Sequence, residues 1–255
     1  MTDASPIPCV LVFAGLDPSG GAGLLADAEA VRAAGARPLC VATALTAQTT
    51  RRMHGFQPLA PALALQTAQA LLEEEPVRAI KVGMLGTPAM ARAVAELLAR
   101  ADLPAVVDPV LSASSGAALF QGGPDAARAA YSALWPHAVL TPNGPEARVL
   151  LDLPEDPRDA DGAERAAREL VRRGAKAALV KGGHAEGSEA VDALCTREAC
   201  ERFSAPRLPG PGARGTGCRL ASALAAGLAR GDSLAQAVGR AKQLVTAYLA
   251  GGRFE

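Results

Sequence analysis

A short run in the last third of the chain combines two glycines with a cysteine. Gly215-Thr216-Gly217-Cys218 precedes an apolar stripe that predicts a helix. Accessible backbone N–H groups and the partial positive charge of a helix N-terminus would bind an anion such as a phosphate. Cys218 would lie in the first turn, where that charge lowers a thiol pKa and favours a thiolate base. A small buried cysteine behind a glycine turn explains the same run equally well.

An amide and a carboxylate follow an apolar run that ends at Thr141. Asn143-Gly144-Pro145-Glu146 would place both groups at the end of a strand, where they could hold hydrated Mg²⁺ beside phosphates. The same tetrapeptide is typical of a helix start, with proline and an acidic residue in the first turn. These residues alone leave both interpretations open.

The segment from Gly15 to Gly23 is rich in glycine and joins a predicted strand to a predicted helix. Gly21, Gly23 and Ala26 match the G-x-G-x-x-G/A dinucleotide pattern. The match is weak, because the next predicted strand ends at Ala47-Gln48 and offers no acidic residue for a ribose. A tight turn with close backbone packing is the alternative. The chain has no G-x-x-x-x-G-K-[ST] motif, which excludes a Walker P-loop.

The elements that would position these residues alternate along the chain. Strands are predicted over 10–14, 39–45, 79–85, 104–107, 138–141 and 177–180, with a hairpin over 191–195 and 201–203. Helices are predicted over 23–34, 63–72, 89–98, 163–172, 220–228 and 234–248. This alternation predicts a mostly parallel sheet with helices on both faces. Ligands bind outside the carboxyl ends of such strands, and those ends carry Asp17, Gln48, Met84, Asp108, Asn143 and Lys181.

The composition argues against several classes of protein. The 255 residues include 26 basic and 26 acidic side chains, so no net charge favours a nucleic acid or an anionic membrane. No linker or repeat divides the chain, which predicts a single domain over 1–255. No apolar run is long enough for a membrane span, and Met1 to Pro8 lacks the basic region of a secretion signal. Five scattered cysteines predict reduced thiols and a cytoplasmic protein.

The ordered set of segments closely resembles the hydroxymethylpyrimidine/phosphomethylpyrimidine kinases of thiamine biosynthesis, within the ribokinase-like superfamily. The resemblance extends from about residue 10 to residue 249, and its motifs are Gly15–Gly23, Thr43–Thr49, Lys81–Leu85, Asp108–Val110, Thr141–Glu146, Val180–His184, Phe203–Arg207 and Gly215–Cys218. It implies a three-layer α/β sandwich, ATP and Mg²⁺ as cosubstrates, and a homodimer. It also implies phosphorylation of 4-amino-5-hydroxymethyl-2-methylpyrimidine, and then of its monophosphate to the diphosphate.

The resemblance further implies a role for each matched residue. Cys218 matches the catalytic base, and Gly215, Thr216 and Gly217 complete an anion hole. The N-terminal glycine-rich loop then belongs to the acceptor side, whose residues are Gly15, Asp27, Gln48, Met84 and Val110. The nucleotide side takes Asn143, Lys181 and Gly183, and the metal takes Asp108 and Glu146.

Several residues depart from the family pattern. Ala213-Arg214 stands where members often carry Thr-His, Arg219 replaces a common threonine, and Ser114 stands where a lysine is usual. Arg214 and Arg219 could compensate for that lysine at a phosphate, or they could point to solvent. A cysteine at the base position leaves a pyridoxal kinase-like enzyme as one alternative, although Gln48 and Asp27 favour a pyrimidine. The altered surroundings of the helix tip leave a pyrimidine-binding module without transfer activity as another.

Overall fold

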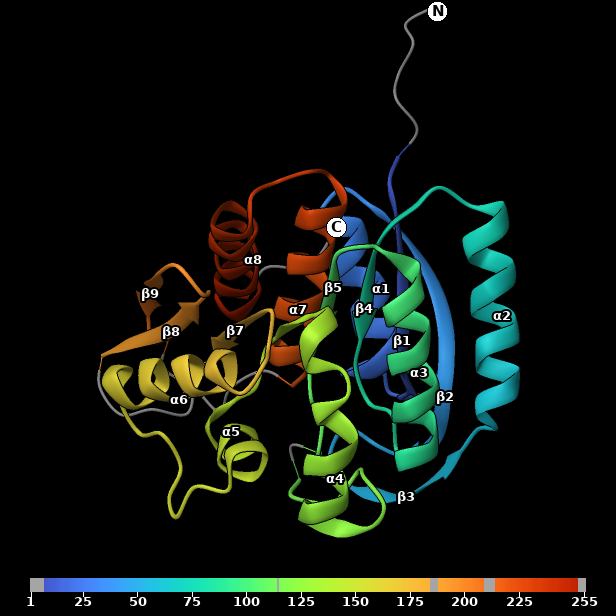
Figure 1. The fold of residues 1–255 in the computed structure, drawn as a ribbon, viewed down its shortest axis with the longest axis horizontal. Helices are drawn as coiled ribbons and strands as arrows, with labels where there is room; N and C mark the ends of the chain where they lie inside the picture. The colour runs from blue at the N-terminus through green and yellow to red at the C-terminus, as the bar shows by residue number, and fades with distance from the viewer. Residues whose placement is uncertain (1–6, 114, 184–187, 209–213, 252–255) are drawn as a thin grey trace, which may run out of the picture.

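A computed structural model describes residues 7–113, 115–183, 188–208 and 214–251 (Figure 1). Nine strands in these ranges form one sheet in the order β3-β2-β1-β4-β5-β6-β7-β8-β9. They are β1 (Cys9–Leu16), β2 (Arg37–Gln48), β3 (Met53–Pro58), β4 (Val77–Val82), β5 (Ala105–Val107), β6 (Val139–Leu140), β7 (Ala177–Val180), β8 (Glu189–Cys195) and β9 (Cys200–Pro206). The six central strands β2, β1, β4, β5, β6 and β7 run parallel to one another. At the edges of the sheet, β3 pairs antiparallel with β2, β8 with β7, and β9 with β8.

Helices cover both faces of this sheet. They are α1 (Gly23–Ala33), α2 (Pro61–Glu74), α3 (Pro88–Ala101), α4 (Gly123–Ser132), α5 (Gly144–Leu151), α6 (Ala160–Arg172), α7 (Thr216–Ala229) and α8 (Leu234–Leu249). Alternate side chains of β1 separate the two cores, as the period of a strand requires. Leu11 and Phe13 pack with α2 to α6, whereas Val10 and Val12 pack with α1, α7 and α8. The predicted three-layer α/β sandwich is confirmed.

The sequence patterns missed β3 and α4, and they left the start of α5 open to two interpretations. β3 contains Gly55 and Pro58, which interrupt a strand signal, and it pairs antiparallel with the last residues of β2, from Ala44 to Gln48. α5 begins at the tetrapeptide that was open to two interpretations. Asn143 accepts from the Glu146 N–H at 2.9 Å, and the Glu146 carboxylate accepts from the Asn143 N–H at 2.8 Å. This capping box confirms the helix start, and it also fixes both side chains at the end of β6.

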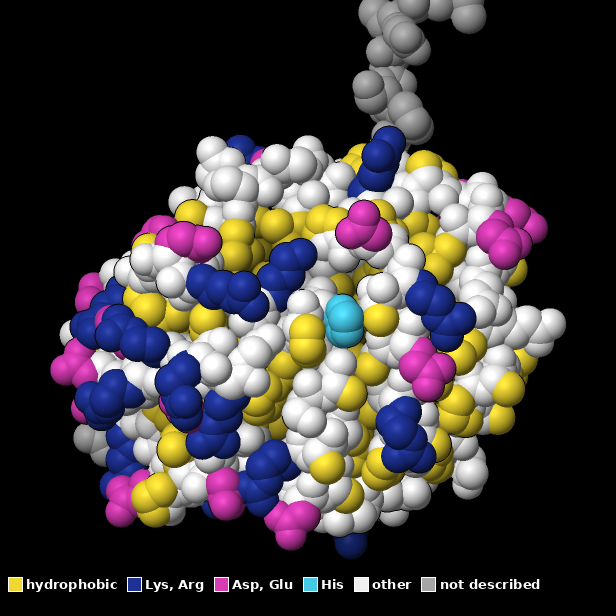
Figure 2. All heavy atoms as spheres, viewed as in Figure 1, with side chains coloured by type: hydrophobic (Ala, Val, Ile, Leu, Met, Phe, Trp, Pro, Cys, Tyr) yellow, Lys and Arg dark blue, Asp and Glu magenta, His cyan; other side chains and the backbone are white. Residues whose placement is uncertain are grey.

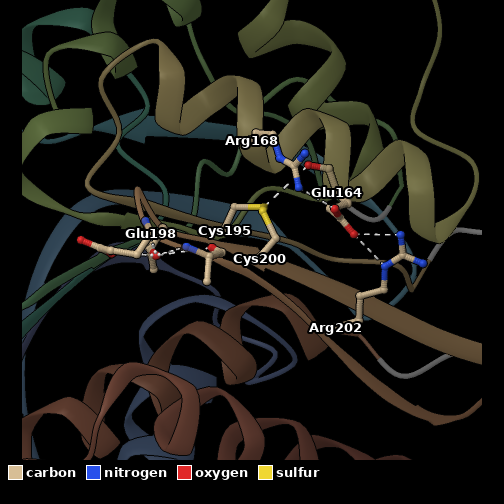
Figure 3. Close-up of a disulfide and its surroundings, with 8 residues drawn as sticks. Glu164, Arg168, Cys195, Glu198, Cys200 and Arg202 are labelled. Atoms are coloured by element: carbon tan, nitrogen blue, oxygen red, sulfur yellow. Dashed lines mark hydrogen bonds and ion pairs between the residues drawn. A yellow bond between two sulfur atoms is a disulfide. The ribbon is translucent and has the colours of Figure 1, made fainter.

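Cys195 and Cys200 form a disulfide, so the prediction of five reduced thiols is wrong (Figure 3). The two residues are register partners at the closed end of the β8–β9 hairpin, with Cα atoms 4.1 Å apart. Their separation in sequence gave no sign of this pairing, because it depends on where the hairpin turns. Cys9, Cys40 and Cys218 are free. The cytoplasmic prediction therefore loses the support that it took from the cysteines.

Charges of both signs share the surface around α6, at the left of Figure 2. Arg168 pairs with Glu164 at 2.8 Å, and Arg172 pairs with Glu169 at 2.6 Å, each within that helix. Arg202 of β9 joins the hairpin to α6 by a 2.8 Å ion pair with Glu164 (Figure 3). Across the described ranges, no helix is both long enough and apolar enough to cross a membrane.

Candidate active site

The residues that directly follow β5, β6 and β7 meet at one edge of the sheet. Backbone hydrogen bonds between neighbouring segments continue beyond the ends of the strands. The Asp108 N–H donates to the Val82 carbonyl, and the Lys181 N–H donates to the Pro142 carbonyl at 2.9 Å. The N-terminus of α7 reaches the same edge. A Cβ at Gly217 would lie 2.9 Å from Lys181 Nζ, so glycine allows the lysine to approach the helix tip.

Lys181 lies between two carboxylates at this edge. Its Nζ donates to Asp108 Oδ1 at 2.6 Å and lies 3.9 Å from Glu146 Oε2. Burial lowers the pKa of Lys181, but attraction to these carboxylates outweighs it and raises the pKa well above its usual value. Burial also opposes ionisation of Asp108, yet the two lysines Lys181 and Lys81 hold its pKa below 3.8. Burial raises the pKa of Glu146 to about 7. The site therefore holds a charged lysine, an ionised aspartate and a glutamate that titrates near neutrality.

Cys218 lies in the first turn of α7, and its thiol is one of the groups that lower the pKa of Asp108. Burial raises the pKa of this thiol to about 12, and the charges of Asp108 and Asp27 add to the shift against the opposing effect of Lys81 and Lys181. The expectation that the helix N-terminus lowers the Cys218 pKa is wrong. Removal of the sulfur from water outweighs the helix dipole, so the thiol is protonated at neutral pH.

A second lysine–aspartate pair lies behind the helix tip. Lys81 Nζ donates to Asp27 Oδ2 at 2.7 Å, Ser222 Oγ donates to Asp27 Oδ1 at 2.8 Å, and both partners of the ion pair are completely buried. Asp27 was expected to line the acceptor pocket, but its side chain lies beneath that region and binds these two groups. The sequence motifs assign no role to Lys81. A single lysine inside the apolar run 79–85 was the available signal, because a buried charge needs a partner.

Apolar side chains form the acceptor side. Met84 packs in a small cluster with Ala44, Leu119 and the partly buried Phe56 and Val110. A Cβ at Gly15 would lie 2.7 Å from the Met84 sulfur, so a larger residue at position 15 would displace the Met84 side chain. Gly15, Met84 and Val110 are thus brought together as expected from the resemblance.

Arg214 joins the helix tip to the acceptor side. Its guanidinium donates to the Thr49 carbonyl at 2.9 Å and to Gln48 Oε1 at 3.2 Å, and lies 3.5 Å from Asp17 Oδ2. Gly215 has a φ of +70°, and a Cβ there would lie only 2.3 Å from the Gly21 carbonyl oxygen. The tip and the N-terminal loop are therefore direct neighbours, and residue 215 must be glycine.

Arg219 turns away from the site. It pairs with Glu29 at 2.7 Å, donates to the Gly21 carbonyl at 3.1 Å and lies 4.4 Å from the centre of the Tyr248 ring. It ties α7 to α1 and α8 rather than facing solvent or a phosphate. The other two departures, Ser114 and Ala213, lie outside the described residues.

Gly183 stands apart from the group around Lys181. It is exposed, and its carbonyl accepts from Arg207 Nη1 at 2.7 Å. The neighbouring Gly182 N–H donates to Asp192 Oδ1 at 2.8 Å, and Asp192 pairs with the buried Lys242. These contacts fix the loop that follows β7.

The acidic residues at this edge do not make a closed metal cage. Within the described ranges, no group of three or more His, Cys, Asp or Glu side chains could hold a metal ion. Asp108 and Glu146 offer two carboxylates on either side of Lys181. Mg²⁺ commonly binds through one or two carboxylates while phosphates and water complete its coordination. The residues present fit a metal ion that arrives with a phosphate ligand.

Phosphoryl transfer depends on positioning and on neutralising charge rather than on covalent help from the protein. An open helix tip, a charged lysine and two carboxylates meet here at the carboxyl edge of a parallel sheet, beside the apolar cluster around Met84. Together they define a small-molecule kinase with a ribokinase-like fold. The family model described as phosphomethylpyrimidine kinase matches residues 17–253. The chain belongs to this family, whose members are ATP-dependent phosphotransferases, and the predicted family and enzyme class are confirmed.

Two relatives illustrate the match. The chain is 40% identical over 246 residues to a Streptomyces coelicolor protein named hydroxymethylpyrimidine/phosphomethylpyrimidine kinase, covering 96% of this chain and 90% of the relative. It is also 40% identical over 249 residues to the thiamine biosynthesis bifunctional protein ThiED of Geobacter sulfurreducens. That match covers 96% of this chain but only 50% of ThiED.

Among solved structures, the chain is similar to the pyridoxal kinase of Staphylococcus aureus in complex with AMP-PCP and pyridoxal. The TM-score is 0.84, the identity is 27%, and the match covers 95% of this chain and 88% of that one. The fold is thus shared by kinases named for a pyrimidine and for pyridoxal, and the choice of acceptor depends on the site.

Proposed function

We propose that this protein transfers the terminal phosphoryl group of ATP to 4-amino-5-hydroxymethyl-2-methylpyrimidine and then to the resulting monophosphate. The observation that carries the proposal is the position of the α7 tip. Gly217 lies against Lys181 on one side, and Gly215 lies against the N-terminal loop of the acceptor side on the other. A phosphoryl group at this tip would therefore have a cation behind it and an acceptor pocket before it.

Lys181 and the tip form the nucleotide-phosphate side of the proposed site. The backbone N–H groups of residues 215–218 and the Lys181 ammonium would bind phosphate oxygens. Asn143 lies next to Lys181 in an isolated parallel bridge, which supports a place beside the same phosphates. Asp108 and Glu146 would hold Mg²⁺, which neutralises phosphate charge when bound. Gly183 would contribute backbone contacts to the nucleotide farther from the transferred group.

Cys218 is proposed to act on the acceptor hydroxyl. Although its thiol is protonated at neutral pH, its sulfur can accept a hydrogen bond from the hydroxyl and orient it toward the tip. A strong base is not needed at the outset, because the transition state forms little bonding to the acceptor. The hydroxyl proton would leave as the new P–O bond forms and the bond to ADP breaks, and it would pass to an oxygen of the transferred phosphoryl group. Gln48, Met84 and Val110 would hold the ring, and the buried Asp27 would support the pocket through Lys81 and Ser222.

The Cys218→Ala variant tests this assignment. We expect the turnover number to fall about 10²-fold while the acceptor dissociation constant changes little. The Cys218→Ser variant is the matched control, since it keeps a hydrogen-bonding group at the same place and should retain more turnover. Unchanged turnover in the alanine variant would remove Cys218 from the mechanism.

A product analysis tests the function itself. The pyrimidine alcohol and its monophosphate are each incubated with ATP and Mg²⁺, and products are separated by chromatography. We expect monophosphate and diphosphate from the first acceptor and diphosphate from the second. Pyridoxal is the competing acceptor, and a tenfold higher kcat/KM for pyridoxal would establish the pyridoxal kinase-like alternative. Calorimetric binding of the pyrimidine without release of ADP would instead establish a binding module.

The remaining features of the proposal concern the whole protein. The single sheet, which contains every strand of the described ranges, supports one kinase domain over residues 1–255. The family resemblance supports a homodimer and a cytoplasmic location. Its partners would be small molecules, with no nucleic acid or membrane involved. Light scattering coupled to gel filtration tests the homodimer.

A further inference from the structure

Arg214 directly precedes the α7 tip and reaches back across the acceptor side. Its side chain is 26% exposed, whereas the ion-paired Lys81 and Arg219 side chains are 0% and 4% exposed. The guanidinium therefore lies where a molecule in the acceptor pocket can meet it, next to the anion-binding N–H groups.

The ion pair of Arg214 with Asp17 is looser than the ion pairs of the neighbouring cations. Its two hydrogen bonds go to neutral oxygens, those of Thr49 and Gln48. The Asp17 carboxylate is 3.5 Å away and already accepts from the Ser19 and Ala22 N–H groups, at 2.9 and 3.1 Å. Lys81, Lys181 and Arg219 each bind a carboxylate at 2.7 Å or less. Neutral partners are weaker competitors for a guanidinium than an anion would be.

The second phosphoryl transfer places special demands on charge. Its acceptor is a phosphate monoester, so two phosphates, each carrying negative charge, must approach each other at the tip. The buried cluster has no spare positive charge for this, because two lysines face the three carboxylates of Asp27, Asp108 and Glu146. An additional cation on the acceptor side would offset the repulsion, and Arg214 is placed to supply it.

We propose that Arg214 binds the phosphate of the monophosphate acceptor and determines the preference of this enzyme for the second transfer over the first. The proposal rests on the proposed function and adds a specificity-determining residue to it. The planar guanidinium can give two parallel N–H donors to one phosphate. It would exchange the Thr49 and Gln48 oxygens for those of the ligand, whereas with the neutral alcohol it would keep them.

The test compares kcat/KM for the two acceptors in Arg214→Gln, Arg214→Lys and wild-type protein. We expect the ratio of kcat/KM for the monophosphate to that for the alcohol to fall about 10- to 100-fold in Arg214→Gln, the effect of losing a charge-assisted contact. Arg214→Lys should restore part of the ratio. The matched control is Arg51→Gln, which removes the same charge from an exposed position near Thr49 and should leave the ratio unchanged.

A binding measurement separates recognition from turnover. Calorimetry without nucleotide should give a dissociation constant for the monophosphate that is 10- to 100-fold larger in Arg214→Gln than in wild-type protein. If kcat/KM falls by the same factor for both acceptors, so that the ratio is unchanged, Arg214 only joins the helix tip to the N-terminal loop and the proposal is overturned. If wild-type protein phosphorylates neither pyrimidine, the proposed function fails and this proposal fails with it.

Discussion

Two lysine–aspartate pairs lie on either side of Cys218 and differ in what surrounds them. Lys81 and Asp27 are both completely buried, and Ser222 occupies the second oxygen of the carboxylate. Lys181 and Asp108 make an equally short contact, but the lysine side chain is 11% exposed and a second carboxylate, Glu146, lies 3.9 Å away. The first pair is closed to ligands, and the second faces the helix tip where an anion can bind.

The difference shows that a lysine–aspartate ion pair can either stabilise the fold or bind a ligand, depending on the groups around it. A closed pair stabilises only when both charges remain, because either one alone would be buried without a partner. The open pair can exchange a contact with its carboxylates for one with a phosphate. Their opposing charges also act together on Cys218, where burial and two aspartates outweigh two lysines.

The largest effect is expected from Lys81→Met, which would break the closed pair. Asp27 would then be buried without its cation, and the free energy of unfolding should fall by about 3–5 kcal/mol. Urea unfolding followed by circular dichroism measures the loss. The double variant Lys81→Met/Asp27→Leu is the control and should recover most of it; if the double variant is no more stable, the closed pair is not the cause.

The next effect concerns the thiol between the pairs. Since the Cys218 pKa is raised from 9.0 to about 12, the thiolate fraction near pH 8 should be about 10³-fold lower in the folded protein than in the unfolded chain. Alkylation by iodoacetamide, followed by mass spectrometry of the Cys218 peptide, should be slowed accordingly. Its rate should rise about tenfold per pH unit between 7 and 9. A plateau in the alkylation rate below pH 8 would mean that the helix N-terminus lowers the Cys218 pKa by more than burial raises it.

Lys181→Met addresses the open pair. We expect kcat/KM to fall by about 10²-fold or more, because a charged donor to the transferred phosphate is lost. The loss of unfolding free energy should be smaller than for Lys81→Met, since the Lys181 side chain is 11% exposed whereas both partners of the closed pair are completely buried. Steady-state kinetics and urea unfolding on the same preparation give both values. A variant that unfolds as readily as Lys81→Met would erase the distinction between the two pairs.

The smallest effect is expected from Asn143→Ala, which removes the capping box that holds Glu146 near Lys181. The free energy of unfolding should fall by about 1 kcal/mol. Ser233→Ala is the matched control, because Ser233 caps α8 through the same kind of box with Gln236. Both variants should lose similar stability, but only Asn143→Ala should also lower kcat/KM. Equal activity in the two would place Asn143 outside the site.

The mostly parallel sheet with helices on both faces, and the meeting of several strand ends at one edge, were both predictable from sequence. Apolar runs ending in Asp108, Asn143 and Lys181 mark the carboxyl ends of parallel strands, and parallel strands bring those ends to one edge. The glycines of the α7 tip and the capping tetrapeptide are local signals, since each acts within four residues. The ordered motifs added the family, which neither composition nor periodicity could supply.

The tertiary structure decided which residues form ion pairs and what electrostatic environment surrounds Cys218. Lys81 meets Asp27 across 54 residues of chain, and Lys181 meets Asp108 across 73. The Cys195–Cys200 pairing required a particular hairpin register, and the high pKa of Cys218 required the segments that remove it from water and bring Asp108 and Asp27 near it. Periodicity is a property of neighbouring residues and can be read from the chain. Desolvation and ion pairing depend on which distant segments enclose a group, and only the folded molecule determines that.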